Sequence, residues 1–242
     1  MKKWVVRLVV LAVVGLGLVY GGILLWTKVI DPPEEKLSAD DLSAVLDDTV
    51  PADVTTPADV TTPADVTTPA GVDGTWTATS ESELGYRVKE VLGGVDTEGV
   101  GRTNVVTGSL TIAGTSVTAA EFSVDVASIE SDSSRRDGQF AGPIMDTANH
   151  PSATFVLTAP IDLGAVPADG EQITVDATGD LTLRGSTKSV TFPLTAEYSN
   201  GRIGVFGNIV IVFADYGIPN PSNSFVKTGD DGLLEFVLVF ER

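Results

Sequence analysis

The chain has 242 residues, with 33 acidic against 15 basic side chains, one histidine and no cysteine. The lack of cysteine excludes disulfides, thiolate metal sites, cysteine nucleophiles and lipid-modified cysteine anchors. A formal net charge of -18 argues against nucleic acid as a partner, because neutralising phosphates requires a basic surface. A single histidine leaves little basis for a multi-histidine metal site or a Ser-His-Asp triad. We therefore expect no metal site and no catalytic residues.

Residues 1–30 are predicted to form a membrane-spanning helix. From Leu8 to Trp26 there are 19 residues without a charge, almost all Leu, Val, Ile, Gly or Ala. As a helix they would be about 28 Å long, close to the roughly 30 Å hydrocarbon thickness of a bilayer. Trp4 and Trp26 bracket the segment, as aromatic residues do at membrane interfaces. Three basic residues precede it, so the positive-inside rule predicts a single-pass protein of the cytoplasmic membrane with its N-terminus inside.

A cleaved secretory signal peptide is the alternative interpretation of this segment. The apolar core of a signal peptide is typically about 7–15 residues long and is followed by small residues at the cleavage site. Here the apolar run is longer, and it ends in the residues 24–27, LLWT, with no Ala-x-Ala pattern nearby. An uncleaved signal-anchor is therefore favoured. Either interpretation exports the rest of the chain, which would be secreted if the segment were cleaved.

Residues 31–72 are predicted to be a disordered acidic linker. The hexapeptide PADVTT occurs three times from Pro51 onward. A six-residue period offers too little apolar surface to offset the chain entropy, and regular prolines favour an extended conformation. Paired threonines beside prolines are typical of an O-glycosylated stalk, and an unmodified spacer is the alternative. The acidic residues 34–48 are compatible with a short helix around their leucines.

Residues 73–242 have the length of one domain and the periodicity of β-structure. Apolar and polar residues alternate strictly over 173–184 and again over 189–198, as in strands with one dry and one wet face. Turn residues lie between such runs at Gly185-Ser186 and at Asn200-Gly201, and Asn-Gly is a strong hairpin signal. Further candidate strands are 108–112, 120–126, 74–80, 84–92, 152–161, 203–213 and 232–241.

These runs predict about eight or nine antiparallel strands, arranged as a sandwich or a closed barrel. In the last run, Leu234, Phe236, Leu238 and Phe240 form one continuous apolar face. The glycine-rich stretch 93–101 lacks the spacing of a phosphate-binding loop and is predicted to be a turn.

Residues 133–150 interrupt the β pattern. We expect a short helix over Arg135–Ala141, capped by Ser134 with Asp137 and stopped at Gly142-Pro143. Its apolar residues Phe140 and Met145 either close one end of a barrel or pack in an ordinary core.

Two polar features of this segment are predicted to be structural. Arg136 and Asp137 are expected to stabilise the helix by local ion pairing. His150 lies between an asparagine and a proline, with no histidine or cysteine to partner it, so neither catalysis nor metal binding is expected there.

This domain contains the segments RRDGQFAGPIMDTANHPSATF (135–155) and GDLTLRGSTKSVTFPL (179–194), with GTWTATSESELGYRV (74–88) and VIVFADYGIPNPS (210–222) on either side. These segments carry a resemblance to the YceI-like family of polyisoprenoid-binding proteins. It covers nearly all of 73–242 in the expected order. Two departures concern the ligand: Ser82-Glu83 stands where members often have His-Ser, and His150 replaces an aromatic residue.

The resemblance implies a lipocalin-like antiparallel barrel whose interior holds an isoprenoid tail, such as that of a quinone or a polyprenyl carrier. No cofactor is required beyond that bound isoprenoid lipid or quinone, and no enzyme activity is expected. A prenyl tail has no hydrogen-bonding groups, so apolar and aromatic residues should line its site. The candidate ligand-binding residues are Trp76, Tyr86, Val88, Phe122, Val124, Phe140, Met145, Phe155, Leu157, Leu181, Phe192, Leu194, Phe213 and Phe236.

The alternative is a non-catalytic cell-envelope interaction domain with a fully packed barrel. Alternation reports which residues face inward and does not report whether the interior is hollow. An apolar cavity with an open mouth would favour lipid binding, and a filled barrel with an exposed apolar patch would favour the alternative. The sequence leaves open whether the domain forms a homodimer.

Overall fold

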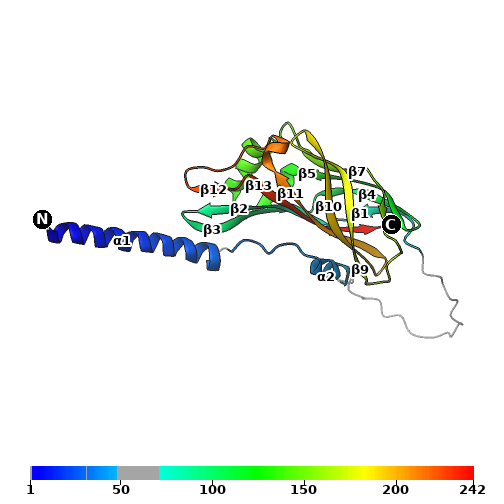
Figure 1. Cartoon of the computed structure of the whole chain (residues 1–242), viewed down its shortest axis with the longest axis horizontal. Helices are drawn as coiled ribbons and strands as arrows, with labels where there is room; N and C mark the ends of the chain where they lie inside the picture. Colours follow the sequence, from blue (N-terminus) through cyan, green and yellow to red (C-terminus); the bar gives the residue numbers. More distant parts are fainter. Residues whose placement is uncertain (1, 31, 48–70) are drawn as a thin grey trace, which may run out of the picture.

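The computed structural model of the chain describes residues 2–30, 32–47 and 71–242. The predicted fold class is confirmed: the domain is a closed antiparallel barrel with a short helix, and an apolar helix precedes it (Figure 1). Eight strands pair in a ring in which the last strand, β13, returns to the first, β1. In ring order they are β1 (Gly74–Ala78), β4 (Val106–Ala113), β5 (Ser116–Asp125), β7 (Ser152–Leu157), β9 (Gln172–Leu183), β10 (Ser186–Ser199), β11 (Arg202–Val212) and β13 (Asp231–Glu241).

The strand β13 pairs with a different neighbour at each of its ends. Its last residues pair with β1, whereas residues 233–237 pair with β2 (Glu83–Leu92). Beyond β2, the sheet continues outside the ring into β3 (Val95–Thr103) and β6 (Glu130–Ser131). Two further short strands, β8 (Ile161–Asp162) and β12 (Val226–Thr228), pair with β5 and β2.

A buried serine joins β1 to β2 at the point where the sheet divides. The hydroxyl of Ser82 donates to the carbonyl oxygen of Val239 at 3.3 Å and accepts from the Val239 N–H at 3.0 Å. A side chain thus replaces the backbone ladder where the strand bends, so the polar groups of Val239 stay paired. This gives Ser82 a structural role.

The tight turns that the sequence predicts are present. Asn200 and Gly201 have φ angles of 54° and 78° and join β10 to β11 as a two-residue hairpin. The turn before β10 lies one residue earlier than predicted: Arg184 and Gly185 form it, and Ser186 already belongs to the strand.

The prediction of a turn over 93–101 is wrong, because only Gly93-Gly94 turn and the strand β3 begins at Val95. Its glycines are explained by what lies over them. A Cβ built on Gly101 would lie 2.5 Å from Cε1 of Tyr86, so the aromatic ring covers the bare backbone of the neighbouring strand. Here glycine marks a close approach inside a sheet.

The predicted helix is present with different ends. It begins as α3 (Ser134–Gln139) and continues through Pro143 as the π-helical turn η3 (Phe140–Ile144), so Gly142-Pro143 does not stop it. Ser134 is not the N-cap. That position belongs to Ser133, whose side chain makes no capping bond.

The expected ion pair between Arg136 and Asp137 is also wrong. The carboxylate of Asp137 accepts hydrogen bonds from the backbone N–H and the hydroxyl of Ser131, at 2.9 and 2.6 Å. Arg136 instead pairs with Asp132 and lies 3.8 Å from Glu90 of β2. These bonds tie the helix to the sheet.

The N-terminal segment forms the helix α1 (Lys2–Leu25), extended by the π-helical turn η1 (Trp26–Ile30). The residues 11–28 have a mean hydropathy of 1.6 and form one stretch that is long and apolar enough to cross a membrane or to serve as a signal sequence.

Residues 32–47, which we name the strap, lie along the outer wall of the barrel (Figure 1). The strap ends in the short helix α2 (Asp40–Asp47), which packs on β10, β11 and β13. Leu42 and Leu46 of α2 are fully buried, and both lie above Gly204 of β11. The part of the predicted linker over 32–47 therefore packs on the barrel, and the PADVTT repeats lie outside the described residues.

Candidate functional site

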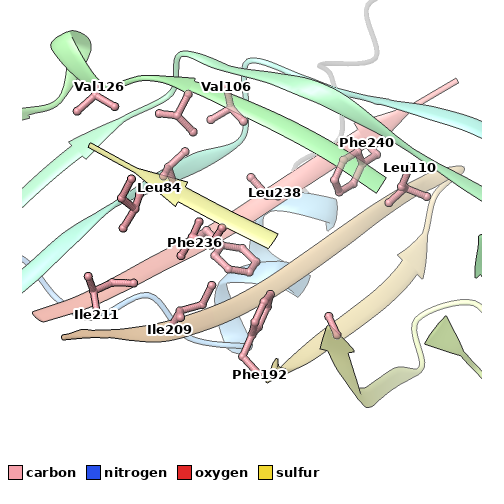
Figure 2. Close-up of a cluster of buried hydrophobic side chains, with 14 of the residues drawn as sticks. Leu84, Val106, Leu110, Val126, Phe192, Ile209, Ile211, Phe236, Leu238 and Phe240 are labelled. Atoms are coloured by element: carbon pink, nitrogen blue, oxygen red, sulfur yellow. The ribbon is translucent and has the colours of Figure 1, made fainter. Parts of the chain in front are cut away.

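The inner wall of the barrel is apolar because the inward positions of its strands are apolar. In Figure 2, side chains from different strands, including Phe192, Phe236 and Phe240, point into the same interior space. The ring of Phe192 makes edge contacts with Phe155 and Phe236, with centroid distances of 5.6 and 6.0 Å. Phe122 lies 5.6 Å from Phe240. Such offset and edge-to-face contacts are the arrangements that aromatic rings prefer in a core.

The interior holds a first cavity of about 160 Å³ toward the end of the barrel where β8 and the β10–β11 hairpin lie. Its lining residues are apolar except Thr154, Glu197 and Tyr198. The carboxylate of Glu197 is already engaged outside the barrel, where it accepts hydrogen bonds from Ser43 of the strap and from Gln172, both at 2.9 Å. The cavity therefore offers carbon surface and almost no polar group.

A second cavity of about 370 Å³ lies toward the opposite end, beneath α3 and η3. Most of its wall is apolar, but Glu90, Arg136 and Gln139 add polar groups. The two cavities share the lining residues Leu84, Val124, Ala153 and Leu234, so they adjoin along the barrel axis.

Twelve of the fourteen predicted ligand-binding residues line one of the two cavities. The first is lined by Phe122, Val124, Phe155, Leu181, Phe192, Leu194 and Phe236, and the second by Tyr86, Val88, Phe140, Met145, Phe213 and again Val124. Their role in binding a ligand stays a prediction.

Trp76 and Leu157 line neither cavity. The indole N–H of Trp76 donates to the carbonyl oxygen of Val72 at 2.8 Å, and the guanidinium carbon of Arg242 lies 4.7 Å from its ring centroid. Trp76 therefore covers the end of the ring. Leu157 packs against the core while partly exposed.

Sequence reasoning missed several lining residues. The alternation along β11 carried the signal for Ile203, Val205, Ile209 and Ile211, whose segment was predicted as a strand but not assigned to the site. Others lie outside the strand pattern: Ile129, Ile144, Ile218 and Phe225.

The polar groups of the second cavity lie in a partly dry environment. Tyr86 stacks on Phe140 with a centroid distance of 4.7 Å, and burial raises the pKa of its hydroxyl, against the opposing effect of Arg136. Burial also raises the pKa of Glu90, which Arg136 partly offsets. The second cavity, whose end at Leu92 and Phe225 we call its mouth, thus combines a mostly apolar wall with a few polar groups.

Metal binding finds no support in the part of the chain that the structure describes, where no group of three or more His, Asp or Glu side chains is placed to hold an ion. The imidazole of His150 packs over the turn at Gly185, where a Cβ would lie 2.7 Å from its Cε1.

The outer wall carries a charged cluster that the sequence did not predict. Glu235 points away from the interior and is only 1% exposed. Its carboxylate contacts the guanidinium groups of Arg87, at 3.1 Å, and of Arg102. The strap completes the cluster, because the carbonyl oxygen of Glu35 accepts hydrogen bonds from Arg87 at 2.8 Å and from Arg102 at 3.3 Å.

Comparison with solved structures agrees with this architecture. A polyisoprenoid binding domain from Saccharophagus degradans, implicated in plant cell wall breakdown, is 23% identical, with a TM-score of 0.57 over 69% of this chain and 98% of that one. BcnA of Burkholderia cenocepacia is 25% identical, with a TM-score of 0.51 over 65% of this chain and 95% of its own.

Among curated proteins, a UPF0312 protein of Pseudomonas putida (strain W619) is 37% identical over 112 residues, which are 43% of this chain and 55% of that protein. A UPF0312 protein of Vibrio vulnificus (strain YJ016) is 31% identical over 130 residues, 49% of this chain and 64% of its own. The match thus spans between about half and two thirds of the length of these relatives. The YceI-like domain family matches residues 76–240, which is most of the chain and all of the barrel except its margins. This protein therefore belongs to the YceI-like family.

Proposed function

We propose that this protein holds the tail of an isoprenoid lipid or isoprenoid quinone inside its barrel, at the outer face of the cytoplasmic membrane to which α1 tethers it. The observation that carries this proposal is the pair of adjoining apolar cavities. A prenyl tail gains roughly 0.8 kcal/mol for each buried CH₂ and requires no hydrogen-bonding partner along its length. Two cavities in line suit a long chain better than a compact ligand.

The size of the space also supports a ligand. At about 370 Å³ the second cavity alone falls in the range of about 300–1,000 Å³ of small-molecule sites. A fully packed interaction domain would have no such space. The polyisoprenoid binding domain of Saccharophagus degradans shares the fold, and we extend its ligand class to this chain.

The proposal is tested by native mass spectrometry of the full chain purified in detergent, with organic extraction of bound lipid. We expect a prenyl lipid to be recovered, or an added isoprenoid quinone to be taken up. A protein that is consistently empty and also fails to take up added quinone would contradict the proposal.

A matched pair of variants on β7 locates the site. Ala153 lines both cavities, whereas Val156 of the same strand is 41% exposed and lines neither. Ala153→Phe places a ring where the cavities meet and should abolish most of the quinone uptake. Val156→Phe adds a similar ring outside the barrel and should leave uptake unchanged. Equal uptake by both variants would place the ligand elsewhere.

A further inference from the structure

The barrel carries its most exposed large hydrophobic side chain at the mouth of the second cavity. Phe225 is 79% exposed and precedes β12, and its carbonyl oxygen accepts a hydrogen bond from Gly93 at the tip of the β2–β3 hairpin. Phe225 and Leu92 both line the cavity, and Val91 is exposed beside them. An exposed aromatic ring lacks the favourable free energy that its burial would give. The exposed apolar residues at this end of the barrel therefore indicate a site that binds an apolar partner.

The strap determines what lies at this end. From Lys28 to Glu35 the chain advances seven residues, which span at most about 25 Å. Glu35 is already bonded to Arg87 and Arg102 on the outer wall, and from there the strap runs away from the hairpin tip toward the β10–β11 hairpin. The chain therefore reaches the barrel from the side of the β2–β3 tip.

The end of α1 lies against that tip. A Cβ built on Gly93 would lie 2.7 Å from Cδ1 of Ile23, and one on Gly94 would lie 4.0 Å from the ring of Tyr20. Both side chains belong to the stretch 11–28 that is apolar enough to span a membrane. In Figure 1, α1 extends away from the end of the barrel where β2, β3 and β12 lie. The hairpin tip is thus level with the last two turns of the span, within about 10 Å of Trp26.

The chemistry of the mouth fits a lipid surface. Aromatic side chains favour the membrane interface, and Phe225 lies where it would enter it. Lys89, Lys227 and Arg135 are exposed on the elements that form this end, together with the acidic Asp96, Asp132 and Asp230. The charges at this end are therefore mixed, and the exposed apolar residues carry its attraction to a bilayer.

From this geometry we infer that the mouth of the second cavity docks on the outer leaflet, with Phe225 inserted among the lipids and the strap holding the barrel in that orientation. Because this inference rests on the proposed function, it adds the route of the ligand: the prenyl tail passes between bilayer and barrel without crossing water.

The experiment uses the absence of cysteine in this chain. Single-cysteine variants Phe225→Cys and Val166→Cys of the full chain are spin-labelled and placed in vesicles of phosphatidylcholine with added phosphatidylglycerol. Val166 is the matched control, because it is also exposed but lies in the loop before β9, at the opposite end. We expect the label at 225 to collide more with oxygen than with a water-soluble nickel chelate, and the label at 166 to show the reverse. A water-exposed label at 225, or a lipid-exposed label at 166, would overturn the inference.

Release of the strap gives a second readout. In the Phe225→Cys background, Leu42→Asp with Leu46→Asp places charges in the buried contact of α2 and should move the label from lipid toward water. An unchanged lipid signal would show that the strap does not orient the barrel. Neither measurement needs a bound ligand, so an empty barrel with label 225 in lipid would refute only the proposed function. A lipid-filled barrel with label 225 in water would refute only the docking.

Discussion

The inner wall of the barrel and the outer patch beneath the strap are both shielded from water, but they are filled in opposite ways. The inner wall is apolar and leaves cavities of about 160 and 370 Å³. The outer patch is charged: Glu235 contacts both Arg87 and Arg102, and both arginines donate to the strap. A closed ring of strands can enclose empty apolar space at little cost in polar groups, whereas buried charges require a partner for each group. Empty space is therefore tolerated inside the barrel, where the wall is apolar, and not in the charged outer patch.

The largest effect is expected from removing a charged group from the outer patch beneath the strap. Glu235→Ala removes the buried carboxylate that Arg87 and Arg102 share, and leaves them more exposed carboxylates, such as Glu98 and Glu83, as partners. It should lower the free energy of unfolding by about 3–4 kcal/mol, toward the low end for a broken buried ion pair. Denaturant unfolding of the full chain in detergent measures this. The control is Glu81→Ala, because Glu81 pairs with Arg202 while half exposed, and its loss should cost less than about 1 kcal/mol. Equal losses would show that the cluster is not specially stabilising.

A substitution on the apolar inner wall should lower the free energy of unfolding by less, because this wall already borders empty space. Phe192→Ala removes a ring that contacts Phe155 and Phe236, and we expect a loss of about 3 kcal/mol, at the low end for a buried phenylalanine. Thermal or denaturant unfolding checks the value, with and without added isoprenoid quinone. Because the larger cavity leaves more room, added quinone should restore part of the lost stability. A variant that quinone does not stabilise at all would contradict a hollow, ligand-accepting interior.

A substitution in the strap should weaken the packing of the strap alone. Leu46→Ala trims a fully buried contact of α2 and should cost about 2 kcal/mol, expressed as local release of the strap and not as unfolding of the barrel. Faster amide hydrogen exchange confined to residues 40–47 would show this. Ala44→Ser changes an exposed position of the same helix and should alter stability by less than about 0.5 kcal/mol. Faster exchange throughout the barrel would mean that strap and ring unfold together.

The smallest expected effect concerns pH at the mouth. Burial raises the pKa of Glu90 above its ordinary value of 4.5, so the folded protein binds this proton more tightly than the unfolded chain does. Protonation of Glu90 therefore stabilises the fold below the unfolded pKa, and this contribution is lost as the pH rises through the higher folded pKa.

The variant Glu90→Gln measures this contribution. Above the pH window in which Glu90 ionises, it should melt at a higher temperature than the natural chain, and the difference should vanish at acidic pH. Melting curves across pH test this, and Glu121→Gln, at an exposed position of β5, controls for the change in net charge. A difference that grew on acidification would reverse the sign and refute the argument.

The strand pattern was predictable because alternation is a local property of the sequence. Each of the nine predicted runs became a strand, and the face of β13 that carries Leu234 and Phe236 lines the first cavity as the pattern indicated. The strand β3 escaped prediction because its glycines are explained only by side chains from other elements: Tyr86 lies over Gly101, and Glu90 and Arg136 lie over Gly99. The side chain that covers a residue is determined by the fold, and a short stretch of sequence does not show which side chain that is.

The residues of the candidate site were likewise predictable where they lie on strands and not where they lie in loops. Inward-facing residues of the strands were identified from their period, but loop residues such as Ile218 and Phe225 were not, because no period governs loops. The buried cluster was also beyond reach: Glu235 lies 148 residues from Arg87, and an alternating glutamate normally indicates a wet face. The arginines of β2 and β3, together with the strap, cover that outward position.

The contacts of the strap also determine where the chain enters the region of the hexapeptide repeats. The described chain before them ends beside the β10–β11 hairpin, where Asn200 and Arg202 bond to the carbonyl oxygens of Leu46 and Val45. After them it resumes at Gly71, whose carbonyl oxygen is bonded by Arg242 at the end of β13, the strand that pairs with β11. Both ends of the repeat region are therefore fastened to one corner of the same barrel. Gain or loss of copies would thus leave the contact between the strap and the barrel in place.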